Sequence, residues 1–153
     1  MVRRASQTTW VLRRMRALGV DQDTLVTYWK LEGRVHLEVA CPVWSSSLTV
    51  AQSQDLDRAQ CMAMAAIAGR WEPSHSHQLL ELGLERLAPR RQKLCEVWAQ
   101  RTARDSRHQD LFVPSGARTR QGKHVQLFRT PQTRTDTYYK SALPYLTRLL
   151  NGF

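Results

Sequence analysis

Glycine and proline are scarce in this sequence of 153 residues, which contains seven glycines and six prolines. No glycine-rich phosphate loop, G-x-G-x-x-G dinucleotide pattern, G-x-S-x-G nucleophile elbow or H-E-x-x-H zinc motif occurs in it. Because these motifs mark several common enzyme classes, their absence argues against an enzyme. We therefore expect no cofactor and no small-molecule substrate.

Long apolar runs and paired cysteines are also missing. No apolar stretch approaches the roughly 20 residues of a membrane span, and the N-terminus has no signal-peptide core. The three cysteines, Cys41, Cys61 and Cys95, are widely spaced and form no C-x-x-C pair. These absences favour a nuclear or cytosolic protein that is not secreted and has no membrane partner, with reduced thiols that lie mostly in the core.

The remaining candidates for chemistry are weak. Asp55 and Asp57 are two positions apart on an expected helix, so they point in different directions and make a poor metal pair. His75 and His77 have no cysteine pair nearby, and we interpret them as cap and loop residues. Cys95 falls on an expected inward helix face, where a packed thiol is the default. No catalytic residue and no metal site are predicted.

Positive charge is abundant and unevenly distributed, with a formal net charge of +10. Residues 1–20 contain five arginines and no acid, and residues 86–134 contain twelve basic and three acidic residues. Such a distribution is typical of a protein that faces a polyanion, most often phosphate, although a merely solubilising surface explains the charge equally well. The candidates for phosphate contact are Arg13, Arg14, Arg16, Arg90, Arg91, Lys93, Arg101, Arg104, Arg118, Arg120 and Lys123.

Apolar residues at helical spacing predict a mainly α fold, with five or six helices in a small orthogonal or bundle-like array. The first helix is rich in arginine and should end at Gly19. Asp21 is positioned to cap the second. The apolar stripe of the first helix is expected at Val11, Met15 and Leu18, and that of the second at Leu25, Tyr28, Leu31, Val35 and Val39, widened by Trp29 and Leu37.

A break follows at Pro42, because the residue before a proline disfavours the helical conformation. Thr49 and Gln52 have the spacing of a capping box and predict a new helix. Its inward residues are expected to be Leu56, Ala59, Ala63, Ala66 and Ile67, and Gly69 should end it. Trp44 in the break is expected to be buried at the corner. Together with Trp71 it stays open as a base-contacting aromatic.

Two further helices are expected before residue 105. One runs over residues 76–82 and stops at Gly83, and the other begins at Pro89 with Leu94 and Trp98 inward. The division predicted from these patterns is a helical domain at 1–104, a long irregular basic segment at 105–137 and a docking segment at 138–153. In the last segment Tyr138 and Tyr139 are expected to be extended, ahead of a terminal helix with Leu143, Leu146, Leu149 and Leu150.

Six sequence blocks occur in a characteristic order along nearly the whole chain. They are LGV at 18–20, LEVACPVWSSSLTVAQ at 37–52, Gly69 after the small-residue helix, LELGLERLAPRRQKLC at 80–95, RHQDLF at 107–112 and YYKSALPYLTRLLN at 138–151. Together they resemble the C-terminal end of non-LTR retrotransposon reverse transcriptases of the jockey and CR1-like type. The resemblance implies a helical thumb and a terminal region, which lie against primer and template and contact RNA, DNA or an RNA–DNA hybrid mainly at phosphates.

Two departures from that family matter. Its palm holds metal-binding aspartates, including an aromatic-x-Asp-Asp turn, whereas this chain contains no Asp-Asp pair and would begin after that turn. Lys140 also stands where the closing block of the family usually has Asn. We therefore expect a fragment that is inert alone and has the polymerase palm as a further partner. The alternatives are a helical interaction or structural domain with no nucleic-acid role, and the product of a decayed element.

Overall fold

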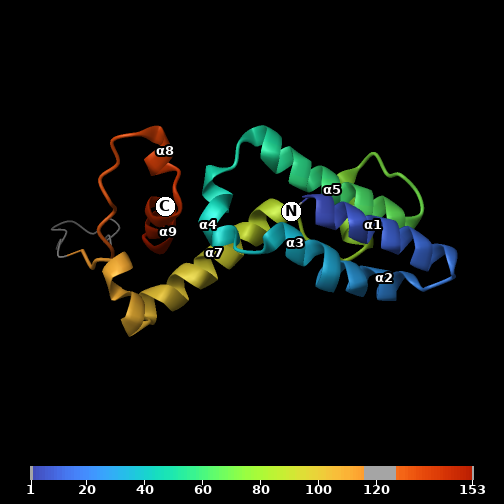
Figure 1. Ribbon diagram of the computed structural model, residues 1–153, viewed down its shortest axis with the longest axis horizontal. Helices are drawn as coiled ribbons and strands as arrows, with labels where there is room; N and C mark the ends of the chain where they lie inside the picture. Colours follow the sequence, from blue (N-terminus) through green and yellow to red (C-terminus); the bar gives the residue numbers. More distant parts are fainter. Residues whose placement is uncertain (1, 116–126, 153) are drawn as a thin grey trace. The chain divides into compact units, whose positions relative to one another are not determined.

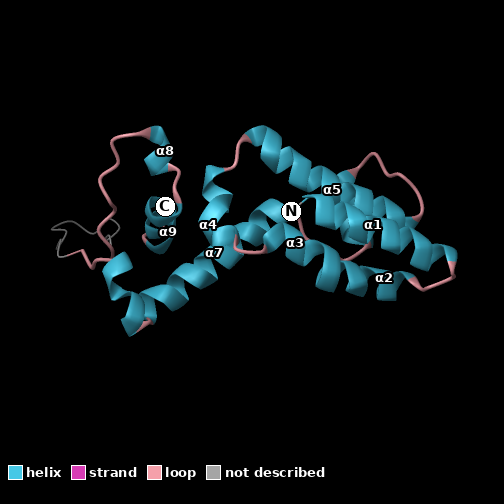
Figure 2. Cartoon of the chain, viewed as in Figure 1, coloured by secondary structure: helices cyan, strands magenta, loops and turns pink. Residues whose placement is uncertain are grey.

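The computed structural model describes residues 2–115 and 127–152. Figure 2 shows helices joined by loops, with no strand in the described part of the chain. Only an isolated antiparallel bridge, between Pro114 and Phe128, has extended pairing there. The predicted mainly α fold is therefore confirmed.

The chain forms two compact units, and each contains segments that are distant in sequence. Unit 1 comprises Met1–Val39 and Thr49–Arg90, and unit 2 comprises Ala40–Leu48 and Arg91–Phe153. The boundaries differ from the expected divisions at 104/105 and 137/138. Residues 40–48 and 91–104 share a core with the C-terminal residues, and local periodicity does not reveal such long-range packing.

Helix α1 (Val2–Ala17) packs along α5 (Val50–Ala68) in unit 1, and the two helices run in the same direction (Figure 1). Its buried residues are Ala5, Thr8, Thr9 and Leu12. The expected stripe at Val11, Met15 and Leu18 was wrong, since the first two are half-buried and Leu18 is 83% exposed. The two threonines can take the inward positions because their hydroxyls donate to carbonyls one turn earlier, at Arg4 and Ala5.

The second helical run contains a π turn. It consists of α2 (Gln22–Tyr28), the π-helical turn Trp29–Gly33 and α3 (Arg34–Glu38), and it begins at the predicted Asp21 cap, whose carboxylate accepts from the Thr24 amide. Buried residues recur every fourth position at Leu25, Trp29, Gly33 and Leu37. Leu25, Trp29 and Leu37 are therefore buried as predicted. The expected inward positions Leu31, Val35 and Val39 are exposed, so that part of the prediction was wrong. A π turn contains more residues than an α turn. The inward positions therefore fall at Trp29, Gly33 and Leu37 instead of at Leu31 and Val35.

Helix α5 follows the sequence-based prediction closely. The Thr49 hydroxyl accepts from the Gln52 amide while the Gln52 side chain accepts from the Thr49 amide, which confirms the capping box. All five predicted inward residues are buried, and Gly69 has a positive φ of 70° just after the helix. Helix α6 (His75–Glu81) begins one residue early, at the Ser74 cap, and ends before Gly83, which also has a positive φ.

Unit 2 contains several short elements around part of one long helix. These are α4 (Cys41–Trp44), the 3₁₀ turn Ser45–Ser47, the later part of α7 (Leu87–Arg104), the 3₁₀ segment Ser106–Leu111, α8 (Asp136–Tyr139) and α9 (Ala142–Leu150). The buried core consists of Cys41, Cys95, Ala99, Phe112 and Leu146. Trp44 is half-buried against it, in a short helix rather than the expected loop.

Some details of unit 2 contradict the sequence-based prediction. Pro89 occupies the third position of α7 rather than its start, and Trp98 is 41% exposed rather than inward. Cys95 is buried as predicted, together with Ala99. Tyr138 and Tyr139 are helical, not extended, because the Thr135 hydroxyl caps α8 by accepting from the Tyr138 amide. The predicted irregular segment at 105–137 is helical at both ends, and its residues 116–126 lie outside the described part.

Candidate nucleic-acid interface

The predicted phosphate-contacting residues fall into separate groups in the structure. Arg13, Arg14 and Arg16 lie on α1 in unit 1, and Arg90 is the last residue of the same unit. Four belong to the part of α7 in unit 2, namely Arg91, Lys93, Arg101 and Arg104. Arg118, Arg120 and Lys123 lie outside the described residues.

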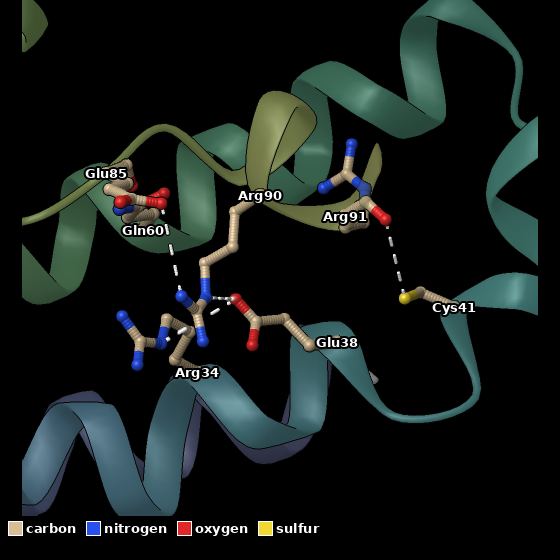
Figure 3. Close-up of polar contacts among 7 residues, drawn as sticks. All are labelled: Arg34, Glu38, Cys41, Gln60, Glu85, Arg90 and Arg91. Carbon is tan, nitrogen blue, oxygen red and sulfur yellow. Dashed lines mark hydrogen bonds and ion pairs between the residues drawn. The ribbon is translucent and has the colours of Figure 1, made fainter. Parts of the chain in front are cut away.

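Arg90 takes part in an ion-pair cluster within unit 1. Its Nε donates to Oε1 of Glu38 at 2.6 Å, and its Nη1 lies 4.0 Å from Oε2 of Glu85 (Figure 3). Arg34 approaches the same Glu38 oxygen at 3.6 Å. Burial and the charge of Arg90 lower the pKa of Arg34, while the two carboxylates oppose this. Arg90 thus attaches the start of α7 to α3, and its charge is largely compensated.

Arg91, the next residue, is buried within unit 2. Its side chain is 3% exposed, and its guanidinium carbon lies 6.0 Å from the centroid of the Trp44 ring. Its carbonyl accepts a weak hydrogen bond from the Cys41 thiol, with 3.9 Å between sulfur and oxygen (Figure 3). Arg91 therefore belongs to the packed interior of unit 2. A side chain buried in this way is poorly placed for direct contact with a phosphate.

Lys93, Arg101 and Arg104 are exposed on α7. Their spacing of eight and three residues places them on one side of that helix, within about 80° at 100° per residue. They form a basic stripe of unit 2. No charged partner of Arg101 or Arg104 is found among the described residues.

A surface groove in unit 1 brings three arginines together with a tryptophan. It has a volume of about 300 Å³. Its lining comes from the C-terminal turn of α1, the last turns of α5 and the loop after α5: Arg13, Arg16, Ala65, Ala66, Gly69, Arg70 and Trp71. The sequence identified Arg13 and Arg16 and kept Trp71 open, but it missed Arg70, which no motif distinguishes from any other loop arginine.

The three arginines of the groove have different roles. Arg16 donates to the carbonyl of Ile67 and so caps α5, and a Cβ at Gly69 would overlap its guanidinium. Arg70 pairs with Glu81 at 2.8 Å across an exposed surface. Arg13 is exposed and pairs with no carboxylate in the described part of the chain. Arg13 is therefore well suited to meet an external anion.

The remaining candidate groups, namely the Cys95 thiol and the metal-ligating side chains, give weaker indications of a function. Burial, and secondarily the neighbouring Cys41, raise the pKa of Cys95 to about 12, so its thiol stays protonated at neutral pH. Among residues 2–115 and 127–152, no three His, Cys, Asp or Glu side chains gather in a way that could hold a metal ion. Within the same residues, no helix has the length and apolarity needed to cross a membrane.

The sequence and fold were compared with known proteins. No family model, curated protein or solved structure matches this chain. Any functional conclusion therefore depends on the residues of the chain and on their arrangement.

Proposed function

We propose that this chain is a thumb-like C-terminal fragment derived from a retrotransposon reverse transcriptase, and that it binds RNA or DNA through the phosphate backbone without sequence preference. The ordered sequence blocks support the origin. The mainly helical fold is compatible with a thumb. The observation that carries the binding function is the groove of unit 1, where Arg13 and Arg70 are exposed beside Arg16.

Binding at this groove should be electrostatic and non-specific. Its arginines come from a helix end and a loop, and a phosphate contact by such a side chain carries no sequence information directly. The exposed stripe of Lys93, Arg101 and Arg104 supplies further positive charge. Arg90 and Arg91 contribute to folding instead, so reversing their charges would test stability rather than binding.

The test is a salt series with the pure chain and labelled RNA–DNA hybrid or duplex DNA. We expect the logarithm of the affinity to fall linearly with the logarithm of salt concentration, because several condensed cations leave the backbone on binding. Absence of binding even at low salt would contradict the proposal, since attraction between exposed charges is strongest there.

A matched pair of variants locates the contact. Arg13→Gln should weaken binding and lower the steepness of the salt dependence by about 0.7–0.9, the value for one lost phosphate contact. Arg58→Gln removes the same charge from an exposed position on α5, where Arg58 pairs with Asp55. It should leave the steepness unchanged. An equal effect of both variants would mean that only net charge matters.

The chain alone should have no polymerase activity. Two-metal nucleotide transfer needs paired carboxylates, and the sequence has no Asp-Asp pair. We expect no nucleotide incorporation on any primer–template with Mg²⁺. Measurable incorporation by the pure protein would refute this part of the proposal.

An exposed apolar stripe favours a second candidate function, a helical interaction domain. Leu31 and Val35 lie on the α2–α3 run and Val39 follows it directly, and the three are 66%, 47% and 52% exposed. Such a stripe is typical of a surface that another protein covers, and a polymerase palm is the partner that the sequence resemblance implies. Self-association or binding of a hydrophobic dye, combined with no binding to nucleic acid, would favour this function or a decayed element.

A further inference from the structure

Trp71 is an exposed aromatic residue in the basic groove of unit 1. Its side chain is 63% exposed, and it lines the groove together with Arg13 and Arg70. An apolar ring that stays in water gains none of the free energy that covering it would give. This placement calls for a ligand with both an aromatic face and a negative charge.

We infer that the groove binds one unpaired nucleotide of a nucleic-acid strand, with its base stacked on Trp71 and its phosphate beside Arg13 and Arg70. This inference rests on the proposed function and adds the kind of strand that the groove selects. In a duplex the faces of each base are covered by its neighbours in the stack, whereas an unpaired base presents a face to an aromatic side chain. The groove should therefore prefer single strands or strand ends.

The charge of the groove fits one phosphate. The C-terminal end of α5 lies in the groove and carries a partial negative charge of about half a unit, which repels an anion. Arg16 offsets this, because its guanidinium is held on the Ile67 carbonyl. Glu81 offsets part of the charge of Arg70, while Arg13 has no carboxylate partner in the described residues. A single phosphate is thus compensated by Arg13, with help from Arg70.

The size of the groove also fits a single nucleotide. Its volume of about 300 Å³ lies at the lower end of the range for small-molecule sites, about 300–1,000 Å³. A groove of this size is large enough for one nucleotide. Arg13 and Arg70 line the same groove as Trp71. A strand that stacks on the ring therefore passes close to both arginines.

The experiment compares a labelled single-stranded oligothymidylate with a blunt duplex of equal length at one salt concentration, using the full chain. Trp71→Ala should lower affinity for the single strand roughly tenfold, the effect of losing one stacked base, and change duplex affinity by less than about twofold. The matched control is Trp10→Ala. Trp10 is equally exposed and lies under Arg14 at 5.9 Å, but it does not line the groove. It should leave both affinities unchanged.

A conservative variant separates stacking from folding. Trp71→Phe keeps an aromatic ring, so it should keep most of the single-strand affinity while losing the quenching of tryptophan fluorescence that stacking produces. If the parent binds both nucleic acids and Trp71→Ala weakens neither, or if Trp10→Ala weakens the single strand equally, the inference is wrong and backbone binding stands. If the parent binds neither nucleic acid, the proposed function fails as well.

Discussion

The ion-pair cluster around Glu38 gives a sharp prediction about stability. Glu38 is 10% exposed, and its Oε1 meets Nε of Arg90 at 2.6 Å and Nε of Arg34 at 3.6 Å. Glu38→Gln keeps the shape of the side chain but removes its charge. Arg34 and Arg90 would then stand close together without the carboxylate between them, at side-chain exposures of only 14% and 29%.

The size of the effect follows from burial. Removing one partner of a fully buried ion pair costs about 3–5 kcal/mol, because the other charge is left in a medium that solvates it poorly. Water reaches part of Arg90, which reduces the expected loss in the free energy of unfolding to roughly 2–3 kcal/mol. For a chain of this size the melting temperature should fall by roughly 5–10 °C.

Urea unfolding followed by circular dichroism measures this loss. The control is Glu32→Gln, on the same helical run, where Glu32 is exposed and has no ion pair in the described residues. A double-mutant cycle with Arg90→Gln should give a coupling energy of about 1 kcal/mol or more. A change for Glu38→Gln below about 0.5 kcal/mol, the usual size for a surface substitution, would refute the reasoning.

Two further predictions concern buried groups. Gly33→Ala should lower the free energy of unfolding by about 1–3 kcal/mol in the same assay, because the added Cβ would overlap the buried ring of Trp29; an unchanged value would contradict this packing. The raised pKa of Cys95, about 12, means that folding favours the protonated thiol. Its contribution to stability is therefore complete below about pH 9 and falls as the pH rises from there towards 12. At pH 8 an alkylating reagent should modify Cys95 only after denaturant is added, and immediate modification of the native protein would contradict this.

Signals that act within a few residues were predictable. The capping box at Thr49, the small-residue face of α5 and the chain reversals at Gly19, Gly69 and Gly83 all occur as the sequence indicates. The exposure of Leu31 and Val35 on the second helical run was not predictable in this way, because it depends on the register of that run. A π turn at Trp29–Gly33 sets it, and this turn allows the Trp29 ring to lie against a position with no side chain.

The sequence by itself determined the helical character, the charge and the set of arginines and lysines available for binding. Only the tertiary structure decided which of them face outward. Arg90 meets Glu38 from 52 positions away, Arg91 lies over Trp44, and Arg70 joins Arg13 at one groove. The physical reason is range. Caps and helix propensity depend on neighbours within a turn, whereas a long charged side chain finds its partner among residues that packing brings together from distant parts of the chain.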